Sequence, residues 1–538
     1  MKAGLDGIQR RIGLAALAGA FILLNIARAQ DETRATVQTL TGTWKLAVDP
    51  ENKGRADRWF ESVRPKALEA PVPGIIQQVF PAYHGVAWYW HSFDVSPGGA
   101  PGDRVMIRFG AVDYLAEVWL NGRHFGAFEG GETPFEFDVA DSIRMEGENL
   151  LAVRVLNPTG APIDGYVLGE TPHRNKTVPP MCGCSFNSGG IMYPVELRWV
   201  PRVHVADVFV RPDMKTGEIA VTVAVRNAGT AAVRGDLDLS LAPAAGGDVL
   251  QSVRRQAEFP AGLSQHEMTV QASQPHLWSL DDPFLYRVTA SLATASQRPH
   301  QRSVRCGFRD FRIVDGFFYL NGRRIFLKST HTGNAMPIGQ QAGVTADFGR
   351  RDMIYAKASG FNMVRFIAGV AYPEQLDLCD ELGLMVYEEC YASWLLGDSP
   401  KMAERFDRST SAMILRDRSH PSVTVWCLLN ETPDGPVFRQ AVGFLPKLRK
   451  LDPTRLVLLG SGRWDGQWSI GSASNPGVGE WQPVWGVEGP NIANASLGAG
   501  GYTPHAGDAH WYPAVPQSLD TDHFIRGLGQ EDKPVFLS

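Results

Sequence analysis

The sequence predicts a multidomain protein of the β plus α/β class, in which two β-sandwiches precede a TIM (β/α)8 barrel. Two observations support this. Up to about residue 306, apolar residues recur with a period of two between turn residues, as in strands that bury one face. After residue 307, short apolar runs alternate with segments of helical period. We therefore divide the chain into residues 1–29, 36–201, 202–306 and 307–538.

Residues 1–29 are expected to be a signal peptide. Lys2, Arg10 and Arg11 precede an apolar stretch at residues 12–26, and "ARA" at residues 27–29 offers the small residues of a cleavage site. A membrane anchor is the less favoured alternative. We therefore expect a periplasmic or secreted protein that has no membrane association after cleavage.

The composition describes a globular protein and excludes one class of partner. The 538 residues are 44% hydrophobic and 20% charged, with a net charge of −5. They contain no basic block, so nucleic acid is not an expected partner. Among the six cysteines, Cys379, Cys390 and Cys427 stand in apolar periodic segments and are predicted to be buried free thiols. Cys182 and Cys184 lie in a Gly-rich loop, where a disulfide or plain packing is expected.

The two sandwiches are predicted from strands at regular spacing. In residues 36–201, "DRVMIRFG", "YLAEVWLNGRHFGAF" and "NLLAVRVLNP" are short strands, and Asn121–Gly122 is a hairpin signal. This pattern favours a jelly-roll sandwich. In residues 202–306, "EIAVTVAVRNAG" and "LYRVTASLAT" belong to a second set of strands, whose length of about a hundred residues is typical of an immunoglobulin-like sandwich.

Residues 307–538 are predicted to form an incomplete barrel. Helical segments such as "TADFGRRDMIYAKASG", closed by Gly360, separate the short strands. We expect seven strands, where a closed barrel has eight, at about residues 325, 362, 384, 423, 455, 507 and 534. The final "EDKPVFLS" resembles the opening of a buried strand. We therefore expect the sequence to stop before the last strand and helices.

The ends of the strands give the candidate site, because chemistry in such barrels sits at the C-terminal face. The strand "VTVWCLL" ends in Asn430–Glu431. A carboxylate at the end of a buried strand is unfavourable unless it is used or paired. A partly buried Glu suits the protonation of a poor leaving group, as in cleavage of a glycosidic bond. Alternatively, Glu431 caps the following helix and Asn430 caps the strand.

Other strand ends converge on the same face. Arg365 lies in the second strand, Glu388 and Glu389 end the third, and His510 and Tyr512 end the sixth. An Arg365–Glu389 salt bridge and ordinary packing of His510 are the structural alternatives.

A long insertion follows the fifth strand. Its tryptophans, Trp464 among them, suit either stacking on a sugar or folding of the loop onto the barrel.

In its motifs the chain resembles glycoside hydrolase family 2, the group of β-galactosidases, β-glucuronidases and β-mannosidases. The resemblance runs from about residue 40 to residue 538. The motifs that carry it are "GVAWYWHSFDV", "RFGAVDYLAEVWLNGRHFGAF", "SGGIMYPVEL", "GFRDFRIVDGFFYLNGRRIFLKST", "GFNMVRFIAGVAYPEQLDLCDELGLMVYEE" and "HPSVTVWCLLNET".

The resemblance implies a role for each of the site residues. Glu431 matches the catalytic acid/base, Asn430 its neighbour that contacts the sugar 2-hydroxyl, and Arg365 the arginine beneath the sugar subsite. His510 and Tyr512 match sugar-contacting positions more loosely. The family nucleophile is a second Glu that would follow "KPVFLS", so we expect the sequence as given to be cut just before it and to be inactive.

The implied activity is that of a retaining exo-β-glycosidase acting on a carbohydrate substrate. A β-galactoside is the first expectation, and a β-glucuronide or β-mannoside follows. "VRFIAGVAYPE" departs from the family's RxSHYP pattern, and "STHTG" from its NRHE pattern, which leaves the sugar open. No metal-ligand spacing is visible, so no metal or other cofactor is expected. A non-catalytic carbohydrate-binding protein is the alternative from another class, and the oligomeric state stays open.

Overall fold

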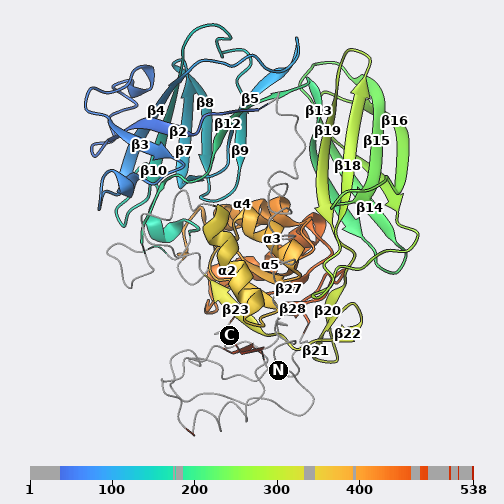
Figure 1. Ribbon diagram of the computed structural model, residues 1–538. Helices are drawn as coiled ribbons and strands as arrows, with labels where there is room; N and C mark the ends of the chain where they lie inside the picture. The colour runs from blue at the N-terminus through green and yellow to red at the C-terminus, as the bar shows by residue number, and fades with distance from the viewer. Residues whose placement is uncertain are drawn as a thin grey trace, which may run out of the picture.

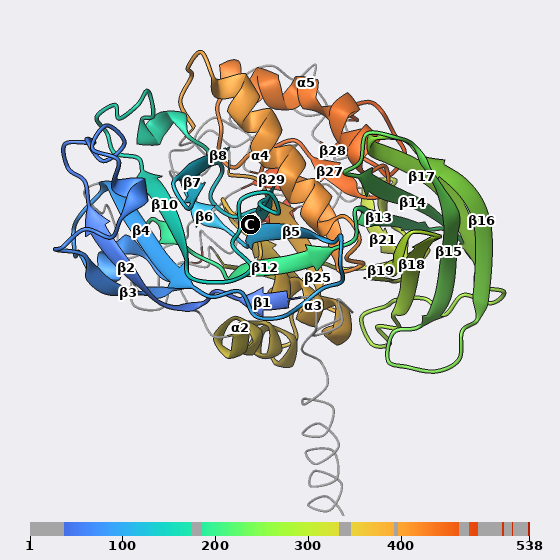
Figure 2. The same ribbon diagram turned by 90° about the horizontal axis from the view of Figure 1, so that it is seen from above.

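The computed structural model describes residues 37–173, 176, 186–332, 346–391, 396–461, 473–482, 508–509, 519 and 536–537. The predicted signal peptide and the Cys182–Cys184 loop lie outside these residues. Figure 1 shows two sandwiches above a layer of helices and strands, and Figure 2 shows them on either side of helix α4. Among the described residues, no helix combines the length and apolar character needed to cross a membrane.

The N-terminal sandwich is built from two antiparallel sheets. Their strand orders are β3-β2-β4-β10-β7-β8 and β1-β12-β5-β9, with a small β11-β6 pair beside them. The predicted hairpin at Asn121–Gly122 joins β7 to β8, and both residues have positive φ (52° and 81°), as a tight turn between strands requires. The strands are β1 (Val37–Thr39), β2 (Gly42–Val48), β3 (Leu68–Val72), β4 (Gly85–Phe93), β5 (Arg104–Phe109), β6 (Val112–Asp113), β7 (Leu115–Leu120), β8 (Arg123–Glu129), β9 (Phe135–Asp138), β10 (Asn149–Asn157), β11 (Gly190–Ile191) and β12 (Val195–Val200), with short 3-10 helices at Trp59–Glu61, Ile76–Gln78 and Leu168–Glu170.

The second sandwich packs a three-stranded sheet, β13-β14-β17, against a four-stranded sheet, β16-β15-β18-β19. Along β14 and β18, inward-facing buried residues alternate with more exposed ones, as the period-two pattern predicts, and the inward-facing residues of the two sheets form one apolar core. The strands are β13 (Val203–Pro212), β14 (Glu218–Asn227), β15 (Val233–Pro243), β16 (Gln251–Phe259), β17 (Gly262–Gln271), β18 (Tyr286–Thr294) and β19 (Gln297–Cys306).

The C-terminal region contains the alternating strands and helices of a TIM barrel. Five strands, β23 to β27, are parallel and adjacent in chain order, and β28 adds to β27 in the antiparallel direction. The elements are β20 (Phe311–Val314), β21 (Phe317–Leu320), β22 (Arg323–Arg324), β23 (Ser329–Thr332), α2 (Ala346–Ala358), β24 (Met363–Phe366), α3 (Pro373–Leu382), β25 (Met385–Glu389), α4 (Met402–Asp417), β26 (Val423–Cys427), α5 (Pro436–Leu451), β27 (Leu456–Leu458), β28 (Ala473–Ser474), β29 (Asp508–Ala509) and β30 (Phe536–Leu537).

The first barrel strand begins later than the sequence predicts. We expected it near residue 325, but Arg323–Arg324 pairs back onto β21 as strand β22. The physical reason is the Asn321–Gly322 turn, whose positive φ values (53° and 75°) fold the chain into a hairpin before the barrel starts. The strands expected near residues 507 and 534 are described only as the two-residue strands β29 and β30, which pair in parallel with each other.

The parallel strands are buried on both faces. A side chain on them therefore points either toward the helices or into the barrel interior. Residues Val364, Val386 and Trp426 belong to a core cluster that also contains side chains of helices α3 to α5, whereas Met363, Tyr387 and Cys427 belong to a separate cluster on the other face of the sheet, inside the barrel. Alternation along a strand therefore decides which charged side chain faces the barrel interior. As predicted, Cys379, Cys390 and Cys427 are buried free thiols.

Candidate active site

The site forms where strands β24, β25 and β26 end. Arg365 on β24 and Glu389 on β25 face the barrel interior, and Asn430 follows β26. All three side chains are buried, with at most 3% of any residue exposed. The Arg365 guanidinium donates from Nε and Nη2 to Glu389 Oε2 at 3.1 and 2.8 Å, and Nη2 also donates to Asn430 Oδ1. The structure thus brings together three residues that the sequence placed on three separate strands.

The charge of Arg365 is held in place by its surroundings. Burial by itself would lower the pKa of this guanidinium, but the carboxylate of Glu389 outweighs burial and the pKa of Arg365 is raised. The guanidinium also lies 5.1 Å from the centre of the Tyr387 ring. Arg365 therefore stays a fixed cation beneath the mouth of the barrel.

Asn430 presents a donor that the protein itself does not use. A guanidinium can only donate, so the Asn430 oxygen must face Arg365 and its Nδ2 group must point elsewhere. Among the described residues, that buried Nδ2 has no hydrogen-bond partner. An unsatisfied buried donor is unfavourable by about 1–3 kcal/mol. A hydroxyl group of a ligand would satisfy it.

Glu431 stands in an unusual backbone conformation beside Asn430. Its φ is +48°, in the left-handed region that non-glycine residues rarely adopt, and its side chain is partly exposed. Its backbone N–H donates to Ser461 O at 2.8 Å, which fixes the chain at this turn. Such strain persists only where the surrounding structure enforces it, and it concentrates at functional sites. No local residue type predicts this conformation.

The loop after β24, residues 367–372, is held by the two carboxylates that end β25. Glu389 Oε1 accepts the Ala368 N–H at 2.9 Å, and Ala368 also has a positive φ of 47°. Glu388 faces the other side of the sheet, where its Oε1 accepts the Ala371 N–H at 2.9 Å. Of the two glutamates, only Glu389 is part of the interior cluster. Sequence reasoning found both glutamates but not this loop.

The remaining predicted site residues cannot be placed. Trp464, His510 and Tyr512 lie outside the residues that the structure describes. Their expected contacts with a sugar stay predictions.

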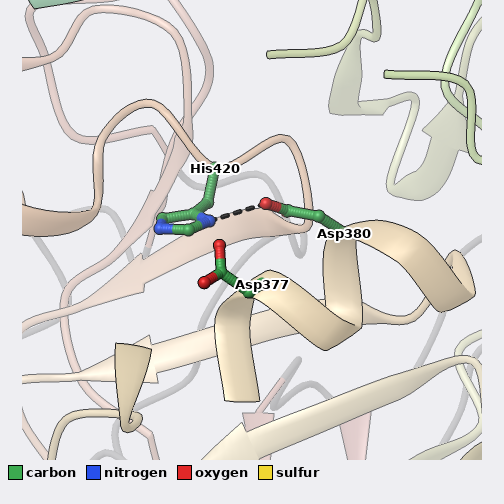
Figure 3. A group of neighbouring side chains, drawn as sticks. All are labelled: Asp377, Asp380 and His420. Atoms are coloured by element: carbon green, nitrogen blue, oxygen red, sulfur yellow. Dashed lines mark hydrogen bonds and ion pairs between the residues drawn. The ribbon is translucent and has the colours of Figure 1, made fainter. Parts of the chain in front are cut away.

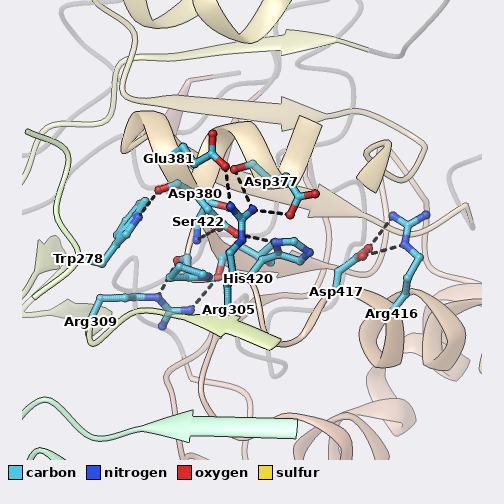
Figure 4. Close-up of polar contacts among 12 residues, drawn as sticks. Trp278, Arg305, Arg309, Asp377, Asp380, Glu381, Arg416, Asp417, His420 and Ser422 are labelled. Atoms are coloured by element: carbon cyan, nitrogen blue, oxygen red, sulfur yellow. Dashed lines mark hydrogen bonds and ion pairs between the residues drawn. The ribbon is translucent and has the colours of Figure 1, made fainter. Parts of the chain in front are cut away.

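A second cluster of charged side chains lies at the opposite end of the strands. Ligand-type atoms of Asp377, Asp380 and His420 lie within 4.8 Å of one another, as Figure 3 shows. His420 Nδ1 and Asp380 Oδ2 are 2.6 Å apart. Figure 4 shows that Arg305, from the second sandwich, reaches Asp377 and also Glu381. The Arg305 guanidinium thus supplies the positive charge that a metal ion would bring to these carboxylates. Because Arg305 comes from the second sandwich, we interpret the cluster as a junction between two domains.

Two sandwiches followed by a TIM barrel, with a polar cluster where the barrel strands end, define the architecture of a multidomain glycoside hydrolase. Three sequence models match: "Glycosyl hydrolases family 2, sugar binding domain" over residues 37–201, "Glycosyl hydrolases family 2" over 203–309, and "Glycosyl hydrolases family 2, TIM barrel domain" over 311–470. The chain belongs to glycoside hydrolase family 2.

Among curated relatives, a β-galactosidase of Thermoanaerobacter pseudethanolicus is 30% identical over 391 residues, which are 69% of this chain and 48% of that one. A β-galactosidase of Yersinia enterocolitica is 25% identical over 472 residues, 80% of this chain and 43% of that one. The chain therefore spans less than half the length of these relatives. The crystal structure of Bacteroides uniformis β-glucuronidase has the same fold, with a TM-score of 0.66 at 22% identity over 79% of this chain and 52% of that one.

Proposed function

We propose that the protein hydrolyses O-glycosidic bonds as a retaining exo-β-glycosidase, with Glu431 as the general acid and base. The observation that carries the proposal is the buried Asn430 Nδ2 group, which has no partner among the described residues and stands beside Glu431 at the end of β26. A sugar hydroxyl would accept from this amide while Glu431 protonates the oxygen of the leaving group. Arg365 and Glu389 would hold the amide in place.

A retaining mechanism needs a second carboxylate about 5–5.5 Å from the first. Glu389 does not suit that role, because it is buried against Arg365 and accepts the Ala368 amide. Glu388 faces the helices and is buried as well. The family resemblance instead implies a nucleophilic Glu directly after "KPVFLS". Reading the gene beyond the codon for Ser538 tests this: a Glu codon supports the mechanism, and a stop codon there favours the non-catalytic carbohydrate-binding alternative.

For the substrate, we propose a β-galactoside first, since the curated relatives named above are β-galactosidases. A β-glucuronide follows, since the solved structure named above, with which the fold is shared, is a β-glucuronidase. A β-mannoside is proposed on the family resemblance alone. We further propose export to the periplasm or outside the cell, which residues 1–29 support. A panel of nitrophenyl glycosides would rank the sugars.

Replacing Glu431 with Gln tests the acid role in the protein read to its stop codon. We expect Glu431→Gln to reduce kcat/KM, which reports the step in which the leaving group departs, by about 10²–10⁴-fold on alkyl glycosides, whose leaving groups need a proton. The loss should be far smaller on dinitrophenyl glycosides, whose leaving groups depart without one. Glu404→Gln, an exposed change on α4, is the matched control and should leave both rates unchanged. Equal losses on both classes of substrate would rule out the acid role.

A further inference from the structure

A single buried arginine connects the N-terminal sandwich to the loop at the barrel mouth. Arg416 lies near the end of helix α4, and its side chain is 12% exposed. Its Nη1 donates to Glu132 O of the sandwich at 3.0 Å, and its Nη2 donates to Ala371 O of the mouth loop at 2.6 Å. Two segments more than two hundred residues apart in the sequence therefore share one guanidinium.

Arg416 binds one carboxylate closely and lies near a second. Its Nε and Nη2 bind the two oxygens of Asp417, both at 2.7 Å (Figure 4), whereas Glu388 Oε1 is 3.6 Å from Nη2. Burial, and then the nearby charge of Asp417, raise the pKa of Glu388 well above its usual range. Through its Oε1, Glu388 accepts the Ala371 amide.

The mouth loop is fixed at both of its ends by these groups. Ala371 is held through its N–H by Glu388 and through its carbonyl by Arg416. Ala368 is held through its N–H by Glu389, the same carboxylate that pairs with Arg365. The contacts therefore run without a gap from the sandwich, through Arg416 and the loop, to Arg365 and Asn430.

We propose that Arg416 is a positioning residue, which sets the mouth loop, residues 367–372, according to how the Glu129–Thr133 segment of the sandwich is docked, and so tunes recognition of the sugar. Only the effect on sugar recognition rests on the proposed function. The loop is also where the sequence departs from the RxSHYP pattern of many β-galactosidases. In this chain the backbone of residues 367–372, which Glu389, Glu388 and Arg416 hold in place, therefore shapes that side of the subsite.

The experiment compares Arg416→Gln with a matched control on the same helix. Arg408 also pairs with the sandwich, through Glu129 Oε2 at 2.8 Å, and within the described part of the chain it makes no hydrogen bond or ion pair with the mouth loop. Amide hydrogen exchange is measured in both variants and in Arg416→Lys. In Arg416→Gln we expect exchange in residues 367–372 to accelerate at least about tenfold, because the loop loses its tether through the Ala371 carbonyl. In Arg408→Gln that loop should exchange at the wild-type rate.

Arg416→Lys keeps the charge against Asp417, but a single ammonium cannot hold Glu132 O and Ala371 O in the same geometry. We expect an intermediate acceleration. Exchange in strands β14 and β17 of the second sandwich reports folding, and should stay at the wild-type rate in all three variants. If the loop keeps its protection in Arg416→Gln, or if Arg408→Gln loosens it equally, the positioning role is wrong.

A kinetic measurement then separates positioning from the proposed function. In the protein read to its stop codon, Arg416→Gln should raise KM for an aryl β-glycoside at least about threefold with little change in kcat, since Glu431 does not lie on this loop. An effect confined to kcat would overturn the proposal. If no glycoside is turned over by any variant, the proposed function fails, while hydrogen exchange still decides whether Arg416 sets the loop.

Discussion

The two ends of the parallel sheet each bury a cluster of opposite charges, yet only one has the features of a binding site. At the amino end, Asp380 pairs with His420, and Arg305 arrives from another domain. Trp278 of the second sandwich donates to Asp380 O at 2.7 Å, so the cluster fastens two domains together. At the carboxyl end, Arg365 and Glu389 come from adjacent strands of one sheet.

The two clusters differ in which buried polar groups remain without a hydrogen-bond partner and in the backbone beside them. The carboxyl-end cluster leaves a buried amide, Asn430 Nδ2, without a partner among the described residues, and it adjoins two residues of positive φ, Ala368 and Glu431. The charged groups of the amino-end cluster are taken up by one another and by the Ser422 backbone amide, which donates to Asp380 at 2.9 Å; the group left over there is the Ser422 hydroxyl, which lies at the domain junction and not at the mouth of the barrel. Buried charge is therefore weak evidence for a site by itself, and an unused donor beside a strained backbone is stronger evidence.

The largest expected effect comes from removing the negative charge at the carboxyl end. Glu389→Gln leaves the Arg365 guanidinium buried without its counter-charge, which should lower the free energy of unfolding by about 3–5 kcal/mol. It should also weaken binding of a sugar lactone, because Asn430 is oriented by Arg365. Urea denaturation and calorimetric titration measure the two effects. Wild-type stability in the variant, or unchanged lactone binding, would contradict this account of the cluster.

A smaller effect, and one on stability alone, is expected at the amino end. Burial lowers the pKa of His420, but the carboxylate of Asp380 outweighs burial and the pKa of His420 is raised. A raised pKa means that the folded state binds the proton more tightly than the unfolded state. The stabilisation is fully present below the unfolded value of about 6.5 and is lost as pH rises through the folded value.

His420→Gln should therefore lower the free energy of unfolding most at pH 5.5, by about 3 kcal/mol, and less at each higher pH. Denaturation at several pH values between 5.5 and 9, followed by tryptophan fluorescence, measures this trend. Lactone binding by the folded variant should equal that of the wild type. A deficit that grows with pH would show that His420 is neutral in the folded protein.

Local sequence patterns predicted the helices of the barrel and the residues of the carboxyl-end cluster. Helices α3 and α4 lie where their period places them, and Gly383, with a φ of 65°, ends α3 as a glycine cap does. The ends of β24, β25 and β26 gave Arg365, Glu389, Asn430 and Glu431, because parallel strands bring their ends together.

Other features depend on contacts distant in the sequence. The positive φ of Glu431 occurs together with a hydrogen bond to Ser461, thirty residues away, and no local residue type indicates it. Arg416 and Arg305 belong to amphipathic segments in which an arginine usually faces solvent, and only the packing of the domains buries them. The roles of Trp464, His510 and Tyr512 stay predictions.

The smallest expected effect distinguishes a domain junction from a cation site. Asp377 is the exposed member of the amino-end cluster, with 49% of its side chain accessible, and it pairs with Arg305. Because Asp377 is half exposed and Arg305 keeps Glu381 as a second partner, this pair contributes about 0–1 kcal/mol, and Asp377→Asn should change the free energy of unfolding by no more than that. Because the guanidinium lies against the carboxylates of Asp377 and Glu381, calcium or zinc should leave the Tm of both wild type and variant unchanged. If a divalent cation raised the wild-type Tm and Asp377→Asn abolished the rise, Arg305 would have to move aside for the ion, and the amino end would be a binding site after all.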